Sequence, residues 1–148
     1  MITYKEALQE FIAAAKPKKE TETIPTLYGE GRILAEDVVS TICVPPWDNS
    51  QMDGYALRAA DIAAASEGAP VRLSVSQRIA AGTTGTELAP GTCARIFTGA
   101  PMPAGADCVV PQEDVTAESG DVVFTRPAPA GAWVRKKAGD VDQGQTVA

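Results

Sequence analysis

Glycine and proline recur about every ten residues through the second half of this chain, and this spacing constrains the fold more than any other feature. Turn residues fall at Gly82, Gly85 and Gly139 and in the segments 90–91, 101–105, 119–120 and 127–131. Helices of ordinary length do not fit between them, whereas strands of about four to eight residues do. The pattern predicts several short strands in a compact antiparallel β domain, which we expect to be a small barrel.

The N-terminal residues have a helical pattern instead. Thr3 and Glu6 form a capping box in the sequence, which indicates that a helix begins there. Apolar residues then recur at helical spacing at Leu8, Phe11, Ile12 and Ala15. We predict one amphipathic helix over residues 4–15, ended by Pro17 and the charged residues 18–20.

Between the helix and the turn-rich half, the chain predicts short elements. Residues 23–27 are strand-like, residues 52–57 resume an apolar pattern, and residues 59–65 resemble a short helix. Residues 71–79 are predicted to form a strand, with alternation at Val71, Leu73 and Val75. The fold class expected from the whole chain is α+β and strand-dominated.

Composition excludes several classes of protein. A chain of 148 residues, 45% hydrophobic and 22% charged, can bury a core, so a globular protein is expected. The net charge of −6 argues against nucleic-acid binding, because phosphate contacts need clustered Lys and Arg. The one basic triplet, at residues 135–137, is interpreted as a solvated strand end or turn. No apolar run reaches the about 18 residues of a membrane span, so no membrane contact is expected.

The cysteines and the absence of histidine limit the chemistry further. Three isolated cysteines, Cys43, Cys93 and Cys108, offer neither a disulfide framework nor a Cys-x-x-Cys site, which favours a reducing, cytoplasmic setting. With no histidine in the chain, Ser-His and Cys-His catalysis and the usual zinc sites are excluded. Any chemistry must use carboxylates, hydroxyls, backbone groups or residues of another chain.

The first candidate functional segment is residues 45–58, PPWDNSQMDGYALR. A rigid diproline precedes a cluster of polar residues that includes Asn49, Ser50 and Asp53. Oxygen ligands on a stiff loop suit a hard cation such as Mg²⁺, or a polar substrate. The alternative is purely structural, because Asp-Asn-Ser is ordinary turn chemistry and Asp-Gly is a hairpin signal.

The second candidate segment is residues 95–107, RIFTGAPMPAGAD. Thr98 and Gly99 place a hydroxyl and exposed backbone N–H groups ahead of a proline-rich loop. Such an arrangement can hold an anion. Taken alone, the segment favours a simple turn over an anion site.

Both segments resemble motifs of the molybdopterin molybdotransferase family, the MoeA proteins and the E domain of gephyrin. Residues 45–56 match a P-x-[FW]-D-N-S-x-M-D-G-Y-A pattern, and residues 95–105 match R-I-[FM]-T-G-A-P-x-P-x-G. Residues 31–38, GRILAEDV, resemble G-R-[IV]-L-A-x-D-[VI], and residues 135–141 resemble a basic run followed by G-x-D-[IV], one residue short of the usual spacing. Four matches in the right order make an unrelated β domain a remote alternative.

The resemblance implies an activity and a site. Enzymes of this family take molybdate and adenylylated molybdopterin and, with Mg²⁺, release AMP and the molybdenum cofactor. The matching residues imply that Asp53 holds Mg²⁺ or orients the substrate by charge, and that Thr98 hydrogen-bonds substrate oxygens. Asn49, Ser50 and Gly99 are implied to contact substrate or to fix the loop, and for Asn49 and Ser50 turn capping is an equal alternative.

The resemblance also implies a domain organisation and partners. Residues 1–42 and 138–148 are expected to form an elongated first domain, interrupted by a β-barrel-like domain at residues 43–137. The chain ends within the strand-like segment 146–148, so we expect the pterin-binding and C-terminal domains to lie beyond it. A natural terminus whose last residues pair in a sheet is the alternative.

Family members are homodimers, and the molybdopterin-adenylylating protein of the pathway is a further expected partner. Alone, the chain is expected to be inactive and to supply Asp53 and Thr98 to a partner's pterin-binding domain. A non-catalytic dimerisation or scaffold module of the same pathway is the alternative function.

Overall fold

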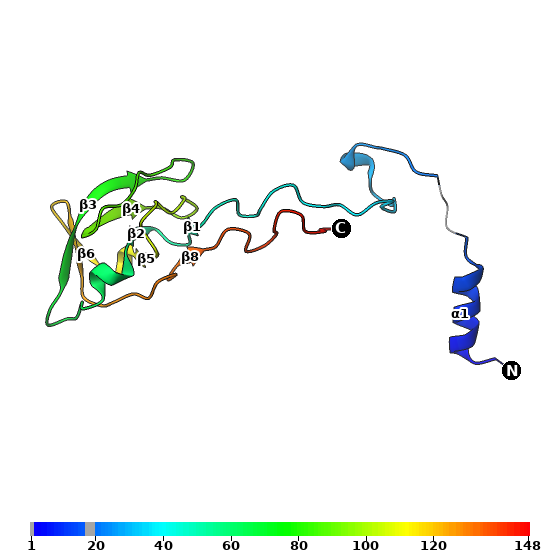
Figure 1. The fold of residues 1–148 in the computed structure, drawn as a ribbon, viewed down its shortest axis with the longest axis horizontal. Coiled ribbons are helices and arrows are strands. Elements are labelled where there is room, and N and C mark those ends of the chain that lie inside the picture. The colour runs from blue at the N-terminus through cyan, green and yellow to red at the C-terminus, as the bar shows by residue number, and fades with distance from the viewer. Residues whose placement is uncertain (1, 17–19) are drawn as a thin grey trace. The chain divides into compact units, whose positions relative to one another are not determined.

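The computed structural model describes residues 2–16 and 20–148, which divide into two compact units, residues 1–37 and 38–148 (Figure 1). The first unit contains helix α1 (Tyr4–Ala14) and the 3-10 helix η1 (Thr26–Tyr28). The predicted capping box is present, since Thr3 Oγ1 accepts from Glu6 N and the Glu6 carboxylate accepts from Thr3 N. The helix predicted over residues 4–15 is therefore confirmed and ends one residue earlier, at Ala14. Of the residues expected to end it, 17–19 lie outside the described residues.

Helix α1 exposes its apolar face within this unit. None of its residues is buried, and the exposed side chains include Tyr4, Leu8, Phe11 and Ile12. The strand predicted over residues 23–27 is wrong, because the chain there is extended only as far as Pro25 and then enters η1. Pro25 has no N–H to donate to a neighbouring strand, and the described residues provide this segment with no pairing partner.

The second unit is built on a six-stranded sheet with a separate two-stranded ladder. The sheet has the order β5-β2-β4-β3-β7-β6, and β1 pairs with β8. The strands are β1 (Asn49–Ser50), β2 (Gly54–Leu57), β3 (Val71–Ile79), β4 (Thr92–Ile96), β5 (Cys108–Pro111), β6 (Thr116–Glu118), β7 (Asp121–Phe124) and β8 (Val134–Arg135). Two 3-10 helices, η2 (Ala59–Ile62) and η3 (Gln112–Asp114), join them. The expectation of a strand-dominated α+β fold is confirmed.

The sheet curls into a half-barrel whose edge strands, β5 and β6, do not pair with each other in the described part of the chain. Pairing is antiparallel as predicted, except that β3 and β4 run parallel. A parallel pair needs a return connection of about a dozen residues, and residues 80–91 supply it. The Gln77 side chain holds this loop, accepting from Thr86 N and donating to Thr86 O.

Strands β2 and β5 are buried on both faces. Every residue of β2 and β5 is buried, so these strands have no solvent side. One core cluster contains Tyr55, Leu57 and Phe124, and the other contains Ala56, Ile96 and Leu88. Successive β2 residues thus alternate between the two clusters, as the two-residue period of a strand requires.

A pair of extended segments, residues 38–45 and 138–148, leads away from the half-barrel (Figure 1). Backbone bonds join Val38 to Ala148 and Val147, and isolated bridges join Val39 to Thr146 and Val44 to Val141. The last residues of the chain therefore pair with the segment that enters the β domain. The domain boundaries at residues 42 and 138 stay a prediction. Within the described residues, no helix combines the length and apolar character that crossing a membrane requires.

Candidate functional site

The ladder between β2 and β4 brings the two candidate segments together. Gly54 at the start of β2 pairs with Ile96 at the end of β4. Because the strands are antiparallel, the residue before Gly54 lies beside the residues that follow Ile96. Asp53 and Thr98, 45 residues apart in the chain, are thereby placed side by side.

Thr98 makes two hydrogen bonds to one oxygen of Asp53. The backbone N–H of Thr98 donates to Asp53 Oδ1 over 2.9 Å, and the Thr98 hydroxyl donates to the same atom over 2.7 Å. These bonds stabilise the charged carboxylate and hold the pKa of Asp53 below its ordinary value, with a smaller contribution from the charge of Arg95. Asp53 is therefore ionised at neutral pH and is a poor proton acceptor.

Both side chains of the Asp53–Thr98 pair are accessible to solvent. Thr98 is exposed and Asp53 is partly exposed. Among the described residues, the second carboxylate oxygen of Asp53 has no protein hydrogen-bond partner. The pair thus presents a fixed negative charge with one carboxylate oxygen that accepts no hydrogen bond from the described residues.

Two glycines allow this geometry. A Cβ on Gly54 would lie 2.2 Å from the carbonyl oxygen of Val110, so β2 and β5 can approach this closely only without a side chain there. Gly99 has a φ of +81°, in the left-handed region that favours glycine. Its N–H donates to Ser50 O, which joins the two candidate loops. Gly99 therefore shapes the turn that carries Thr98.

Asn49 and Ser50 lie in the neighbouring ladder. Ser50 is 1% exposed, and its hydroxyl donates to Met52 O and accepts from Met52 N. Asn49 pairs with Arg135 in the β1–β8 ladder, and its side-chain amide donates to Trp47 O. The structure places both residues in the framework of the loop, beside the Asp53–Thr98 pair. Their contact with substrate stays a prediction.

Sequence reasoning missed the role of Asp48. Its carboxylate accepts from Lys136 Nζ and from the backbone N–H of Lys137, each over 2.8 Å. The hydrogen bond from Lys136, followed by that from Lys137, lowers the pKa of Asp48. The basic triplet stands at the end of β8, as predicted, and it anchors the diproline loop. The sequence signal for this contact was an acidic residue in one motif and lysines in another, which can form an ion pair.

Arg95 supports the backbone beside Asp53. Its guanidinium donates to Gly54 O over 2.9 Å and to the Gln112 side chain. The backbone N–H of Gln112 in turn donates to Asp53 O over 3.0 Å. The guanidinium also lies 5.2 Å from the Tyr55 ring and 4.6 Å from the Phe97 ring. From β4, Arg95 therefore stabilises the backbone of residues 53–54.

The described residues do not form a magnesium centre by themselves. They contain no cluster of three or more His, Cys, Asp or Glu side chains able to hold a metal. Mg²⁺ prefers about six oxygen ligands and is often held by one or two carboxylates together with substrate phosphates and water. Asp53 supplies one free carboxylate oxygen, which is too few to fix an ion.

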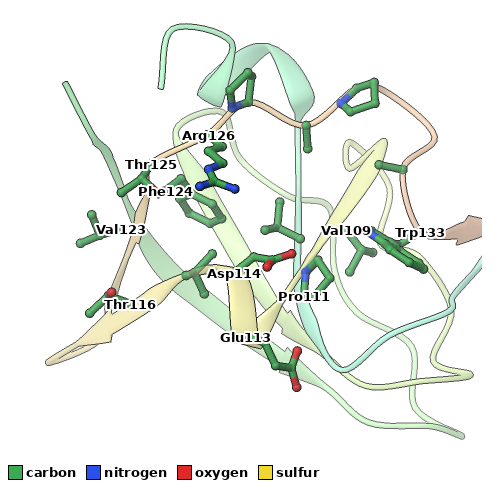
Figure 2. A pocket seen from close by; sticks show the side chains of 16 residues that line it. Val109, Pro111, Glu113, Asp114, Thr116, Val123, Phe124, Thr125, Arg126 and Trp133 are labelled. Atoms are coloured by element: carbon green, nitrogen blue, oxygen red, sulfur yellow. The ribbon is translucent and has the colours of Figure 1, made fainter. Parts of the chain in front are cut away.

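A groove of the second unit is lined by residues other than the Asp53–Thr98 pair. It has a volume of about 520 Å³ and lies between β5, η3, β7 and the loop that leads to β8. Figure 2 shows Trp133 at one end of this groove and Val123 and Thr116 at the other. Neither Asp53 nor Thr98 lines it.

A family model described as the MoeA N-terminal region (domain I and II) matches residues 2–148. The chain belongs to this family. Molybdopterin molybdenumtransferase of Synechococcus elongatus is 40% identical over 147 residues, covering 97% of this chain and 36% of the relative. The protein of the same name from Haemophilus influenzae is 36% identical over 149 residues, covering 99% of this chain and 36% of the relative.

A solved structure agrees with the sequence relatives. The molybdopterin biosynthesis moeA protein from Pyrococcus horikoshii OT3 superposes with a TM-score of 0.89 at 34% identity, covering 100% of this chain and 39% of that chain. The predicted membership of the MoeA family is confirmed. This MoeA N-terminal region spans less than two fifths of the length of the relatives described here.

Proposed function

We propose that this chain supplies the Asp53–Thr98 part of a molybdotransferase site in molybdenum cofactor biosynthesis. The reaction uses molybdate and adenylylated molybdopterin and releases AMP and the molybdenum cofactor. Two findings support the proposal: the relatives are named molybdopterin molybdenumtransferase, and the two motif residues form one solvent-facing pair. That hydrogen-bonded pair is the observation that carries it.

Asp53 acts as a fixed charge in this proposal. Its lowered pKa makes it unsuited to removing a proton near neutral pH. An ionised carboxylate with one free oxygen can accept a hydrogen bond from a hydroxyl or amino group of the pterin substrate and so orient it.

Thr98 has two alternative uses. While its hydroxyl donates to Asp53, the Thr98 oxygen can only accept hydrogen bonds. A substrate oxyanion at this position requires the hydroxyl to rotate away from Asp53, which leaves the backbone N–H to hold the carboxylate. Thr98 would then donate to the oxyanion without releasing Asp53.

Magnesium enters only as an expectation from the family. When bound, it would screen the negative charge of substrate phosphates. Asp53 would contribute at most one of its ligands, and the substrate and residues beyond this chain would supply the others. We therefore assign no step of the reaction to the metal.

The chain is proposed to act in trans within a homodimer, opposite a pterin-binding domain. A scaffold is the second candidate, and the apolar face of α1 favours it, because Leu8, Phe11 and Ile12 stay exposed among the described residues of their unit. The molybdopterin-adenylylating protein is a proposed partner of the pathway in both cases.

Complementation separates the two functions. The chain is mixed with a protein carrying the remaining domains of a relative, and molybdenum insertion is measured by AMP release. Asp53→Asn is expected to lower the rate at least about a hundredfold, as loss of a positioned charge does. Glu87→Gln, the same carboxylate-to-amide change at an exposed loop residue, is the control and keeps the rate. Equal rates for both variants would favour the scaffold.

A further inference from the structure

The arginines of residues 38–148 differ in one respect. All but Arg78 have a polar partner for the guanidinium within the described residues: Arg58 with Leu88 O, Arg72 with Glu118, Arg95 with Gly54 O, Arg126 with Glu67, and Arg135 with Asp140. Arg78 is exposed, and in this part of the chain its guanidinium forms neither an ion pair nor a hydrogen bond. Its five N–H donors are available to a ligand.

Arg78 nevertheless contacts an aromatic ring. Its guanidinium carbon lies 4.3 Å from the centre of the Phe97 ring, and that of Arg95 lies 4.6 Å from the same centre. Arg78 and Arg95 are also direct neighbours in the parallel ladder of β3 and β4. The aromatic ring attracts both cations and brings them to one place on the sheet.

Two like charges at neighbouring ladder positions repel each other. A bound anion between or beside the guanidinium groups would remove the repulsion and satisfy the free donors of Arg78. The arrangement therefore favours binding of an oxyanion.

The arginine pair adjoins the Asp53–Thr98 pair. Phe97 immediately precedes Thr98, and Arg95 donates to the carbonyl of the residue that follows Asp53. An anionic ligand that approached Asp53 without a nearby cation would be repelled. The positive charges of Arg78 and Arg95 offset the negative charge of Asp53 on one side of the site.

We propose that Arg78, Phe97 and Arg95 form a binding subsite for a tetrahedral oxyanion next to Asp53 and Thr98. The proposal rests on the proposed function only for the identity of the anion, which is either molybdate or the phosphate of an adenylyl group. Both are tetrahedral oxyanions that a guanidinium can bind through two parallel hydrogen bonds.

The test is an NMR titration of the chain at low ionic strength, in separate arms with sodium molybdate and with AMP. The Phe97 and Thr98 amide signals are followed. Saturable shifts in either arm are expected, and the arm that binds more tightly identifies the anion. Binding should be lost in about 0.5 M chloride, because exposed charges are screened. Unmoved Phe97 and Thr98 signals in both arms would overturn the proposal.

Matched variants test the residue assignment. Arg78→Gln is expected to raise the dissociation constant about three- to tenfold, because one charge-assisted contact at an exposed site is lost. Arg72 lies on the same strand and is paired with Glu118. Arg72→Gln removes the same charge and should change the dissociation constant less than about twofold. If both variants weaken anion binding equally, the effect comes from net charge alone and the subsite is overturned.

Failure of the subsite and failure of the proposed function are distinguishable. Neither Arg78→Gln nor Arg72→Gln alters the Asp53–Thr98 hydrogen bonds, so both proteins can be used in the complementation assay. If the unsubstituted chain binds neither anion while turnover still depends on Asp53, only the subsite is overturned. Intact anion binding with turnover that ignores Asp53 would overturn only the molybdotransferase assignment.

Discussion

Replacing Gly54 by alanine tests how the site is held together. The added Cβ would lie 2.2 Å from the carbonyl oxygen of Val110 and 3.0 Å from the Cα of Pro111, both backbone atoms of buried strand β5. Ordinary contacts begin at 3.4 Å, so β2 and β5 must move apart by about 1 Å. No flexible side chain is available to absorb the shift.

The cost follows from two contributions. Forcing an extra methyl group into a close-packed interior costs about 1–3 kcal/mol. Weakening the ladder bonds between β2 and β5 adds about 1 kcal/mol, the usual net value of one hydrogen bond. The sum of about 3 kcal/mol predicts a fall in Tm of about 10 °C for a domain of this size.

Thermal unfolding followed by circular dichroism measures the effect. Gly68→Ala is the matched control, because a Cβ there meets nothing within 4 Å and the backbone needs no positive φ. The control should change the free energy of unfolding by less than about 0.5 kcal/mol. If Gly54→Ala unfolds at the same temperature as Gly68→Ala, the close approach of β2 and β5 is wrong.

Three further predictions concern other parts of the second unit. Ser50→Ala should lower the free energy of unfolding by about 1–2 kcal/mol in urea denaturation, because Met52 loses both partners in a buried turn; an unchanged midpoint would contradict the role of the hydroxyl in the loop. The lowered pKa of Asp48 contributes stability above about pH 4, and this stability is lost as the pH falls through the pKa of the folded state. Asp48→Asn should therefore flatten the acid limb of a plot of unfolding free energy against pH. Parallel plots for the variant and the unsubstituted chain would argue against the hydrogen bond from Lys136. Burial raises the pKa of Cys93 and of Cys108 to about 12, so iodoacetamide at pH 8 should alkylate Cys43 alone until the protein is unfolded, as mass spectrometry would show; fast native labelling of Cys93 or Cys108 would contradict that burial.

Local signals in the sequence predicted local structure well. The Thr3–Glu6 capping box placed the start of α1, and the pattern of residues 71–79 gave the bounds of β3. Both follow from interactions between near neighbours in the chain. The strand predicted at residues 23–27 was wrong because strand propensity has no effect without a partner strand.

Contacts between distant segments were beyond the reach of pattern reasoning. The parallel pairing of β3 with β4 depends on how residues 80–91 fold back, which no spacing rule specifies. The salt bridge of Asp48 with Lys136 joins two loops 88 residues apart. The pairing of Asp53 with Thr98 was expected only from the resemblance to a family, since each motif taken alone favoured a turn.

The account depends on Asp53 being an ionised carboxylate that Thr98 holds through hydrogen bonds. An NMR titration of the Thr98 amide signal between about pH 2 and pH 6 measures this directly. We predict a transition with a midpoint below the ordinary aspartate pKa of 3.8, and its disappearance in Asp53→Asn. A Thr98 signal that does not titrate, or one that follows a carboxyl group with a pKa at or above the ordinary value, would contradict the account.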